Sequence, residues 1–347
     1  MLRDHTLFIV GAGASAEYKM PVGDELKWNI VQALHNVPEE GPSALGRMRG
    51  AIEQYAHEIG HSQSEIFSEA RKLANGLMQA TSIDSYIENL RQHNPRIAVL
   101  GKIGIAACLL DRERSSPLFS HAGKPVAFQN LGHTWVNKLF QILVEGQSVS
   151  TLDTLFDRAT FVIFNYDRCV ERFLECSLQN YFDLTDFEAR ELVKRCKIVH
   201  PYGTLGPWGK PGENTEAVGF GALGAGPTFT SRRLLKVAEN DLRTYSEYIE
   251  DADEIAQNQV ALAATQTIVY LGFAFHRQNV RLLSRIVPRG RSRVLATTFK
   301  VPEPANDVIV DDIFSIMNAP RDDDHPTLAN LEAGPFIDSY RLLLSQR

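Results

Sequence analysis

The sequence has few cysteines, and none of them form a paired motif. Zinc ribbons and thioredoxin-like redox sites need two cysteines separated by two residues, and that spacing is absent, so the sequence excludes both. Scattered cysteines in a chain of 347 residues are typical of small buried side chains in a reducing compartment. We therefore expect no bound metal. The cysteines are Cys108, Cys169, Cys176 and Cys196.

Long hydrophobic runs and an excess of positive charge are also missing. The longest apolar stretch, 97–110, is interrupted by Lys102 and is shorter than the roughly 18 residues of a membrane-spanning helix. The apolar run 6–10 is shorter than the core of a secretory signal peptide, about 7–15 residues. The formal net charge of −6 gives no sign of the basic face of nucleic-acid-binding proteins. We predict a cytoplasmic protein that binds neither membranes nor nucleic acid directly.

Five short apolar runs rich in β-branched residues stand out against a helical background. Each run is continuous rather than alternating, as is typical of strands buried on both faces of a parallel sheet. The pattern predicts an α/β fold, with a Rossmann-like, mostly parallel sheet flanked by helices. The runs cover residues 6–10, 160–164, 197–199, 267–271 and 293–297.

The long interval between the first two strands has the periodicity of helices, for example at Ile83, Ile87 and Leu90. We therefore expect one Rossmann-like domain over 1–300, with 36–150 as a large helical insertion. Residues 301–347 are rich in proline and aspartate at first, which predicts a linker followed by a short C-terminal helix.

The first strand runs into Gly11-Ala12-Gly13-Ala14-Ser15-Ala16, a Gly-x-Gly-x-x-Ala pattern. In dinucleotide-binding folds the first glycine permits a tight turn, and the second lets the backbone approach a pyrophosphate. Backbone N–H groups at the start of the next helix would then face the phosphates. A dehydrogenase would show a second strand ending in an acidic residue about 20 residues further on. Here the helical pattern continues instead, which disfavours hydride transfer.

Polar residues follow the second strand directly, as Asn165-Tyr166-Asp167. Open α/β sheets bind their ligands just beyond the carboxyl ends of the strands. Asn165 is therefore a candidate to orient a ribose hydroxyl or a water, and Asp167 to accept hydrogen bonds from an amide. Asp167 is also well placed to cap the helix that is predicted to begin at Arg168, and both roles are compatible.

The third strand delivers His200-Pro201-Tyr202-Gly203 to the same edge. An imidazole titrates near neutral pH, so His200 is the best candidate for a general base, although it could instead bond only a loop carbonyl. Tyr202 is the second candidate, and Gly203 would let a ligand or a loop come close. The fourth strand ends at Gly272-Phe273, where the backbone would approach a nucleotide.

Taken in this order, the four segments resemble the sirtuin superfamily, and more closely its bacterial antiphage branch of NAD-consuming effectors. Met20-Pro21-Val22-Gly23-Asp24-Glu25-Leu26 and Ser82-Ile83-Asp84 also resemble short motifs of that branch. The resemblance implies a zinc-free NAD glycohydrolase in which Asn165 positions the ribose and water and His200 is the base. It assigns NAD binding to Gly11, Ala12, Gly13, Ala14, Ser15, Asp167, Tyr202, Gly203, Gly272 and Phe273.

Two departures from the superfamily leave other functions open. Deacylating sirtuins carry a four-cysteine zinc module that this chain cannot build, which disfavours the alternative of an NAD-dependent protein deacylase. The histidine of the superfamily's His-Gly motif is Tyr202 here, and His200 lies two residues earlier, about 6–7 Å along a strand. Loss of that histidine is compatible with a second alternative, a non-catalytic scaffold subunit that senses NAD or ADP-ribose.

We expect no fused sensor domain that would restrain an NAD-depleting enzyme. The resemblance therefore implies a separate activator or sensor, such as an ATPase of the HerA type or a phage component. We also expect a homo-oligomer, with the helical insertion as its natural interface.

Overall fold

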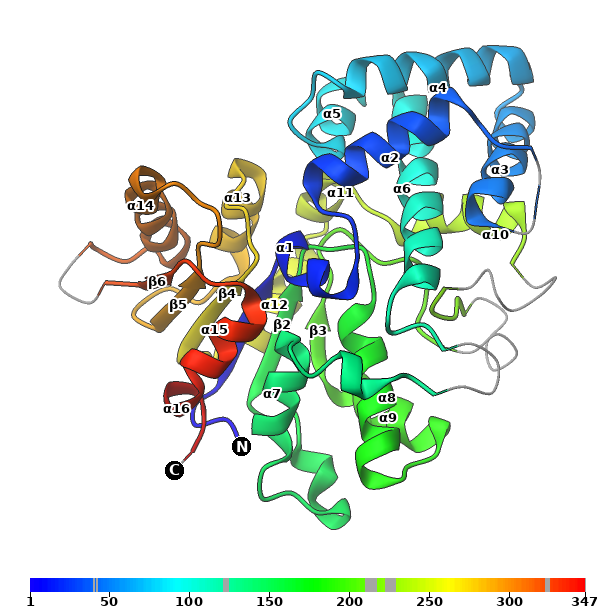
Figure 1. Ribbon diagram of the computed structural model, residues 1–347. Helices are drawn as coiled ribbons and strands as arrows, with labels where there is room; N and C mark the ends of the chain where they lie inside the picture. Colours follow the sequence, from blue (N-terminus) through cyan, green and yellow to red (C-terminus); the bar gives the residue numbers. More distant parts are fainter. Residues whose placement is uncertain are drawn as a thin grey trace.

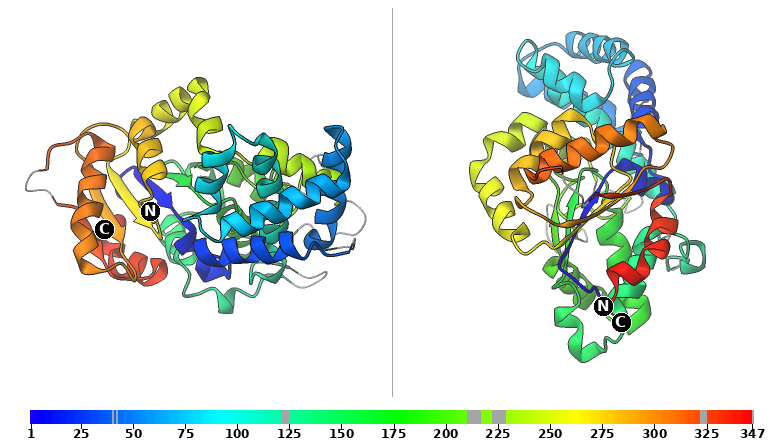
Figure 2. Two further views of the ribbon diagram at one scale, coloured as in Figure 1. Left: turned by 90° about the horizontal axis from the view of Figure 1, so that it is seen from above. Right: turned by 90° about the vertical axis from the view of Figure 1, so that its left-hand side faces the viewer.

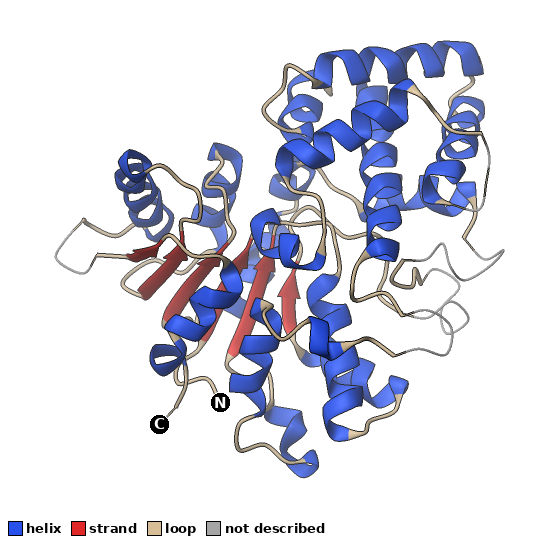
Figure 3. Ribbon diagram, in the orientation of Figure 1, coloured by secondary structure: helices blue, strands red, loops and turns tan. Residues whose placement is uncertain are grey.

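The computed structural model describes residues 1–39, 41, 43–120, 125–209, 217–221, 229–321 and 325–346. Its centre is a six-stranded sheet in the order β3-β2-β1-β4-β5-β6, and every neighbouring pair is parallel (Figure 3). The predicted α/β, Rossmann-like fold is confirmed. The strands are β1 (Thr6–Val10), β2 (Ala159–Ile163), β3 (Lys197–Val199), β4 (Thr267–Leu271), β5 (Arg293–Thr297) and β6 (Thr327–Ala329).

The strand order places a topological switch point between β1 and β4. From β1 the chain adds strands in one direction, and from β4 it adds them in the other. The two central strands are buried along their whole length, which explains their continuous apolar sequences. Phe8 of β1 stacks on Phe161 of β2, with ring centroids 5.2 Å apart. In such sheets, ligands bind outside the carboxyl ends of the strands at the switch point.

Helices cover both faces of the sheet (Figure 2). One face carries α7 (Trp135–Val144), α8 (Cys169–Phe182), α9 (Asp186–Arg195), α15 (Ala333–Ser339) and α16 (Arg341–Leu344). The opposite face carries α12 (Ala252–Leu262), α13 (Arg277–Ile286) and α14 (Asn306–Met317). For the helices between strands, this division follows from right-handed crossovers that run in opposite directions on the two sides of the switch point. The helices α15 and α16 follow β6, and α15 packs on α7.

A separate group of helices, here called the helical body, lies beyond the carboxyl ends of β1, β2 and β3 (Figure 1). It differs from the predicted insertion over 36–150 at both ends. The helical body begins earlier than residue 36, because the apolar stripe of α2 packs on α4 and α6. It ends earlier than residue 150, because α7 packs with the helices that cover the sheet. The segment 231–250 returns to it. Its elements are α2 (Gly23–His35), α3 (Ala44–Glu58), α4 (Gln63–Leu77), α5 (Ile83–Leu90), α6 (Pro95–Ser115), α10 (Ser231–Lys236), the π-helix Val237–Asp241 and α11 (Tyr245–Glu250).

The C-terminal segment is more regular than the linker that the sequence predicts. Pro302 precedes the short 3₁₀ turn Glu303–Ala305 just before α14, and α14 buries an apolar stripe. Beyond it, β6 pairs with β5 at the edge of the sheet. The chain ends beside its start, since Leu2 and Ser345 form an isolated antiparallel bridge. No helix in the described residues combines the length and apolarity needed to cross a membrane.

Candidate functional site at the carboxyl ends of β1, β2 and β3

Side chains that follow three neighbouring strands meet at the carboxyl edge of the sheet. Ser15 ends the short helix α1 (Ala12–Ser15), which forms most of the loop after β1. The segment after β2 contributes Asn165 and Asp167, and the segment after β3 contributes His200. Glu171, from the first turn of α8, completes the group. We call these five residues the strand-end cluster. Each is nearly buried, with at most about a tenth of its side chain exposed to solvent.

Asn165 ties β2 to the loop after β1. Its side-chain Nδ2 donates hydrogen bonds to the Gly11 carbonyl at 3.1 Å and to the Ser15 hydroxyl at 2.7 Å. Both amide hydrogens are therefore used inside the protein. The remaining polar atom of the side chain, Oδ1, only accepts hydrogen bonds. The sequence-predicted positioning residue is thus fixed in direction, with an acceptor left for a hydroxyl or a water.

Asp167 has the helix-capping position that the sequence suggested for it. Its Oδ1 accepts a hydrogen bond from the Cys169 backbone N–H at 3.1 Å, at the start of α8. Burial raises the pKa of Asp167, and hydrogen bonds from Cys169 and Ser15 oppose that rise. The same carboxylate therefore caps a helix and joins the strand-end cluster through Ser15.

His200 has a partner at each ring nitrogen. Nδ1 lies 3.1 Å from the Asn165 carbonyl oxygen, and Nε2 lies 2.8 Å from Glu171 Oε1. A carbonyl only accepts, so Nδ1 carries a hydrogen. Burial lowers the pKa of the imidazole, but the charge of Glu171 and the bonds to Glu171 and Asn165 outweigh burial, and the pKa is raised. Neither ring nitrogen of His200 therefore faces open space, where the predicted role of general base would need a lone pair.

Glu171 is a residue that sequence reasoning missed. It lies 29 residues before His200, and a glutamate in the first turn of a helix is an ordinary feature that carries no sign of such a partner. Its second carboxylate oxygen, Oε2, is buried and has no hydrogen-bond partner in the part of the chain that the structure describes. Only the three-dimensional contact brings it into the strand-end cluster.

The glycines that the sequence assigned to nucleotide binding are required in the structure by a contact between two loops. A Cβ on Gly11 would lie 2.4 Å from the Gly272 carbonyl oxygen, and one on Gly272 would lie 2.1 Å from the Ala14 backbone nitrogen. The Gly13 N–H donates to the Gly272 carbonyl at 3.1 Å rather than facing open space. These glycines are required where the loops after β1 and β4 touch. Ala12 and Gly13 remain at the surface of that contact.

Gly203 is likewise required by a contact within the protein. Its φ is +74°, and a Cβ there would lie 1.9 Å from the Asp241 carbonyl oxygen at the end of the π-helix. The segment that approaches Gly203 is therefore the end of the π-helix, which is part of the helical body.

Tyr202 and Phe273 lie outside the strand-end cluster. The Tyr202 hydroxyl donates to Asn279 Oδ1 at 2.6 Å, and burial raises its pKa far above the ordinary value for tyrosine. Phe273 packs against Phe164, with ring centroids 5.1 Å apart. Both residues belong to an aromatic layer that also contains Phe164 and Tyr166.

The motif at Ser82-Ile83-Asp84 reaches this layer from the helical body. Ser82 caps α5 through a capping box with Ser85, which sets the first turn of the helix. Asp84 in that turn accepts a hydrogen bond from the Tyr166 hydroxyl. Tyr166 stands between Asn165 and Asp167 in the sequence, so the helical body contacts the segment that carries two residues of the strand-end cluster.

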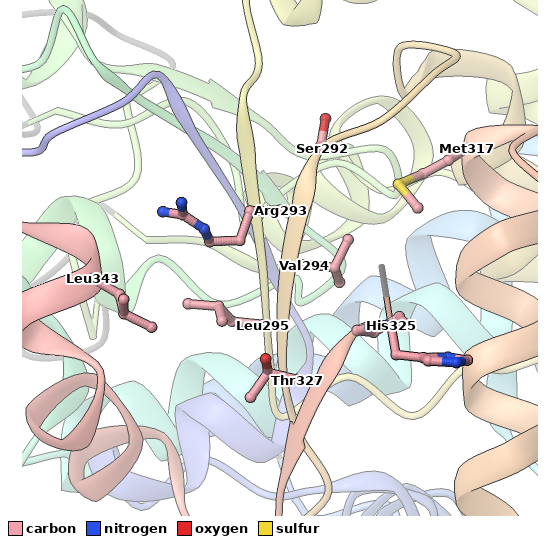
Figure 4. A pocket seen from close by; sticks show the side chains of 9 residues that line it. Ser292, Arg293, Val294, Leu295, Met317, His325, Thr327 and Leu343 are labelled. Atoms are coloured by element: carbon pink, nitrogen blue, oxygen red, sulfur yellow. The ribbon is translucent and has the colours of Figure 1, made fainter. Parts of the chain in front are cut away.

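A cavity lies at the opposite edge of the sheet, near the first residues of β5 and β6 (Figure 4). Arg293, Thr327 and Leu343 are among its lining residues, and none of the strand-end cluster lines it. Across the described residues, no group of three or more His, Cys, Asp or Glu side chains is arranged to hold a metal ion. Comparison of the chain with models of protein families, with curated proteins and with solved structures found no match.

Proposed function

We propose that this chain is an NAD glycohydrolase, an enzyme that cleaves the nicotinamide–ribose bond of NAD to release nicotinamide and ADP-ribose. The observation that carries the proposal is the junction of Asn165 with the loop after β1, where one amide bonds the Gly11 carbonyl and the Ser15 hydroxyl. The junction lies at the carboxyl edge of a Rossmann-ordered sheet, where open α/β sheets bind nucleotides.

The chemistry of the bond fits the residues of the strand-end cluster. When the bond breaks, nicotinamide leaves with the electron pair and the ribose carbon becomes an oxocarbenium-like cation, to which water adds with loss of one proton. Negative charge and fixed acceptors stabilise such a transition state. Asp167 and Glu171 supply carboxylates, and Asn165 Oδ1 is an acceptor for a ribose hydroxyl or for the water.

The resemblance to the antiphage branch of the sirtuins supports a proposal for the role of this activity in the cell. There, cleavage would deplete NAD during infection, and a separate activator would switch it on. An ATPase of the HerA type or a phage component has that role in this proposal, and the active form would be a homo-oligomer.

The deciding experiment incubates the purified protein with NAD, alone and together with an acetylated peptide. Nicotinamide and ADP-ribose without need of the peptide are the products expected of the hydrolase. Acetyl-ADP-ribose formed only with the peptide would mean a deacylase. Binding of NAD by calorimetry with no product would mean a sensing subunit, and neither binding nor product would remove NAD from the proposal.

Asn165→Ala tests directly whether the junction of Asn165 with the loop after β1 is part of the active site. Loss of a positioned group in a transition-state site should lower the rate of nicotinamide release by about 10²-fold or more. Asn137→Ala is the matched control, because Asn137 also donates from Nδ2 to a backbone carbonyl but lies on the exposed surface of α7. Near-normal turnover by a folded Asn165→Ala protein would contradict the site assignment.

A further inference from the structure

The strand-end cluster needs a proton acceptor, and its histidine is not available as one. Hydrolysis releases one proton from the attacking water, as the reaction above requires. Both ring nitrogens of His200 face acceptors, the Asn165 carbonyl at 3.1 Å and the Glu171 carboxylate at 2.8 Å. A histidine bonded in this way donates twice and has no lone pair to receive a proton. The acceptor must therefore be another group.

Glu171 has the unused acceptor. Its Oε1 is held by His200, whereas its Oε2 is buried without a hydrogen-bond partner in the described residues. A buried carboxylate oxygen without a donor is destabilising, because it has lost its water and gained no partner. A donor that binds there, such as a water or a hydroxyl, would remove this cost. The unpaired oxygen is therefore the acceptor of the strand-end cluster that a donor would satisfy.

Two features place positive charge beside the Glu171 carboxylate. It lies in the first turn of α8, where the unpaired backbone N–H groups of the helix stabilise negative charge. The His200 ring lies at its Oε1, with Nε2 at 2.8 Å. His200 in turn bonds the backbone carbonyl of Asn165, so the carboxylate is linked through one side chain to the residue that would position the ribose.

We propose that Glu171 is the catalytic base of the strand-end cluster and that His200 is a positioning residue that holds it. This inference rests on the proposed cleavage of NAD. As the nicotinamide–ribose bond breaks, the water oxygen bonds to the ribose carbon and its proton passes to Glu171 Oε2. Nicotinamide departs neutral with the electron pair of the broken bond, and Glu171 later returns the proton to solvent.

Two substitutions separate this role from a base role for His200. Glu171→Gln keeps the shape and an oxygen for His200 but replaces the accepting Oε2 with a donor, so turnover should fall about 10²–10⁴-fold. NAD affinity by calorimetry should change little. His200→Gln keeps a side-chain N–H that can hold Glu171, so it should retain far more turnover than Glu171→Gln. The opposite ranking, with Glu171→Gln active and His200→Gln inactive, would overturn the inference.

Chemical rescue distinguishes a base from a residue that only supports the fold. Glu171→Ala should be inactive on NAD, and added formate should restore part of the rate by filling the space of the lost carboxylate. Glu175→Gln is the control, because Glu175 is a buried carboxylate one turn further along α8 that bonds Arg190 at 3.3 Å. It should lower stability without a defect that formate repairs.

The outcomes separate the inference from the proposed function. A wild-type protein that releases no nicotinamide overturns both. A wild-type protein that cleaves NAD, together with a Glu171→Gln variant that cleaves it equally fast, overturns only the role of Glu171. Failure of formate to rescue a folded Glu171→Ala variant that still binds NAD also overturns that role.

Discussion

His200 and Tyr202 both follow β3 and are only two residues apart in the sequence, but their side chains have different surroundings. The imidazole lies in the strand-end cluster between Asn165 and Glu171, whereas the Tyr202 hydroxyl points to Asn279 at the start of α13. Two residues on one strand share a face only while the strand continues. Here β3 ends at Val199, and the chain turns at 201–202 before Gly203, so the shared face is lost.

This difference predicts a mild effect on activity for Tyr202→Phe. The change leaves the partly exposed Asn279 oxygen without this donor, which should lower the free energy of unfolding by about 0.5–1.5 kcal/mol. Turnover of NAD should fall less than about tenfold, since the hydroxyl is outside the strand-end cluster. Urea unfolding and a nicotinamide-release assay measure the two effects. Tyr181→Phe, at an exposed tyrosine, is the control. A stable but inactive Tyr202→Phe protein would show that the tyrosine has the catalytic position.

The sequence predicted some elements well and others poorly, for physical reasons. Each of the predicted strands agrees with the structure to within a residue, because a fully buried strand needs a continuous apolar run. β6 was missed because Thr327–Ala329 is a short edge strand with partly exposed side chains. The start of the helical body was missed because α2 has the same periodicity whether it packs on a sheet or on other helices.

The candidate site could be predicted only in part. Residues that directly follow strands, such as Asn165 and His200, were found because the carboxyl edge of a parallel sheet gathers them. Glu171 was not, because its contact with His200 depends on how α8 packs. The glycines were found as a pattern, but a sequence does not distinguish a glycine that meets a phosphate from one that meets another loop.

Contact between the loops after β1 and β4 predicts that Gly272→Ala destabilises the fold even without NAD. Gly272 has a φ of +55°, and its added Cβ would lie 2.1 Å from the Ala14 nitrogen. Backbone strain of about 1–2 kcal/mol and overpacking of about 1–3 kcal/mol should both lower the free energy of unfolding. Gly290→Ala is the matched control, since Gly290 has a φ of +116° and open space around it. Equal losses in urea unfolding for the two variants would contradict the loop contact.

At the scale of the whole molecule, the helical body is joined to the sheet domain by buried polar contacts. Asp84 of α5 bonds Tyr166, and Glu113 of α6 pairs with Arg168 at 2.6 Å. Both contacts end on the segment between β2 and α8, which also carries Asn165 and Asp167. The position of the helical body is therefore coupled to the geometry of the strand-end cluster, and a change in one should be measurable in the other.

The pair of Glu113 and Arg168 provides the test of that coupling. Their side chains are 0% and 1% exposed, and Arg168 also donates to the Gly219 carbonyl at 3.2 Å. Glu113→Gln leaves a buried guanidinium without its counter-charge, which should lower the free energy of unfolding by about 3–5 kcal/mol. Asp153→Asn removes the partner of Arg195 on the surface, where the pair is 75% and 55% exposed. That control should change stability by less than about 1 kcal/mol.

The rate of nicotinamide release is a second measurement on the Glu113→Gln variant. If the helical body holds the segment between β2 and α8, Glu113→Gln should lower nicotinamide release at a temperature where the protein remains folded, although Glu113 is outside the strand-end cluster. Restoring the charge with Glu113→Asp should recover part of the stability and part of the turnover together, because the shorter carboxylate can still face Arg168. Loss of stability with turnover unchanged would show that the Glu113–Arg168 pair supports the fold, and that the geometry of the strand-end cluster does not depend on the helical body.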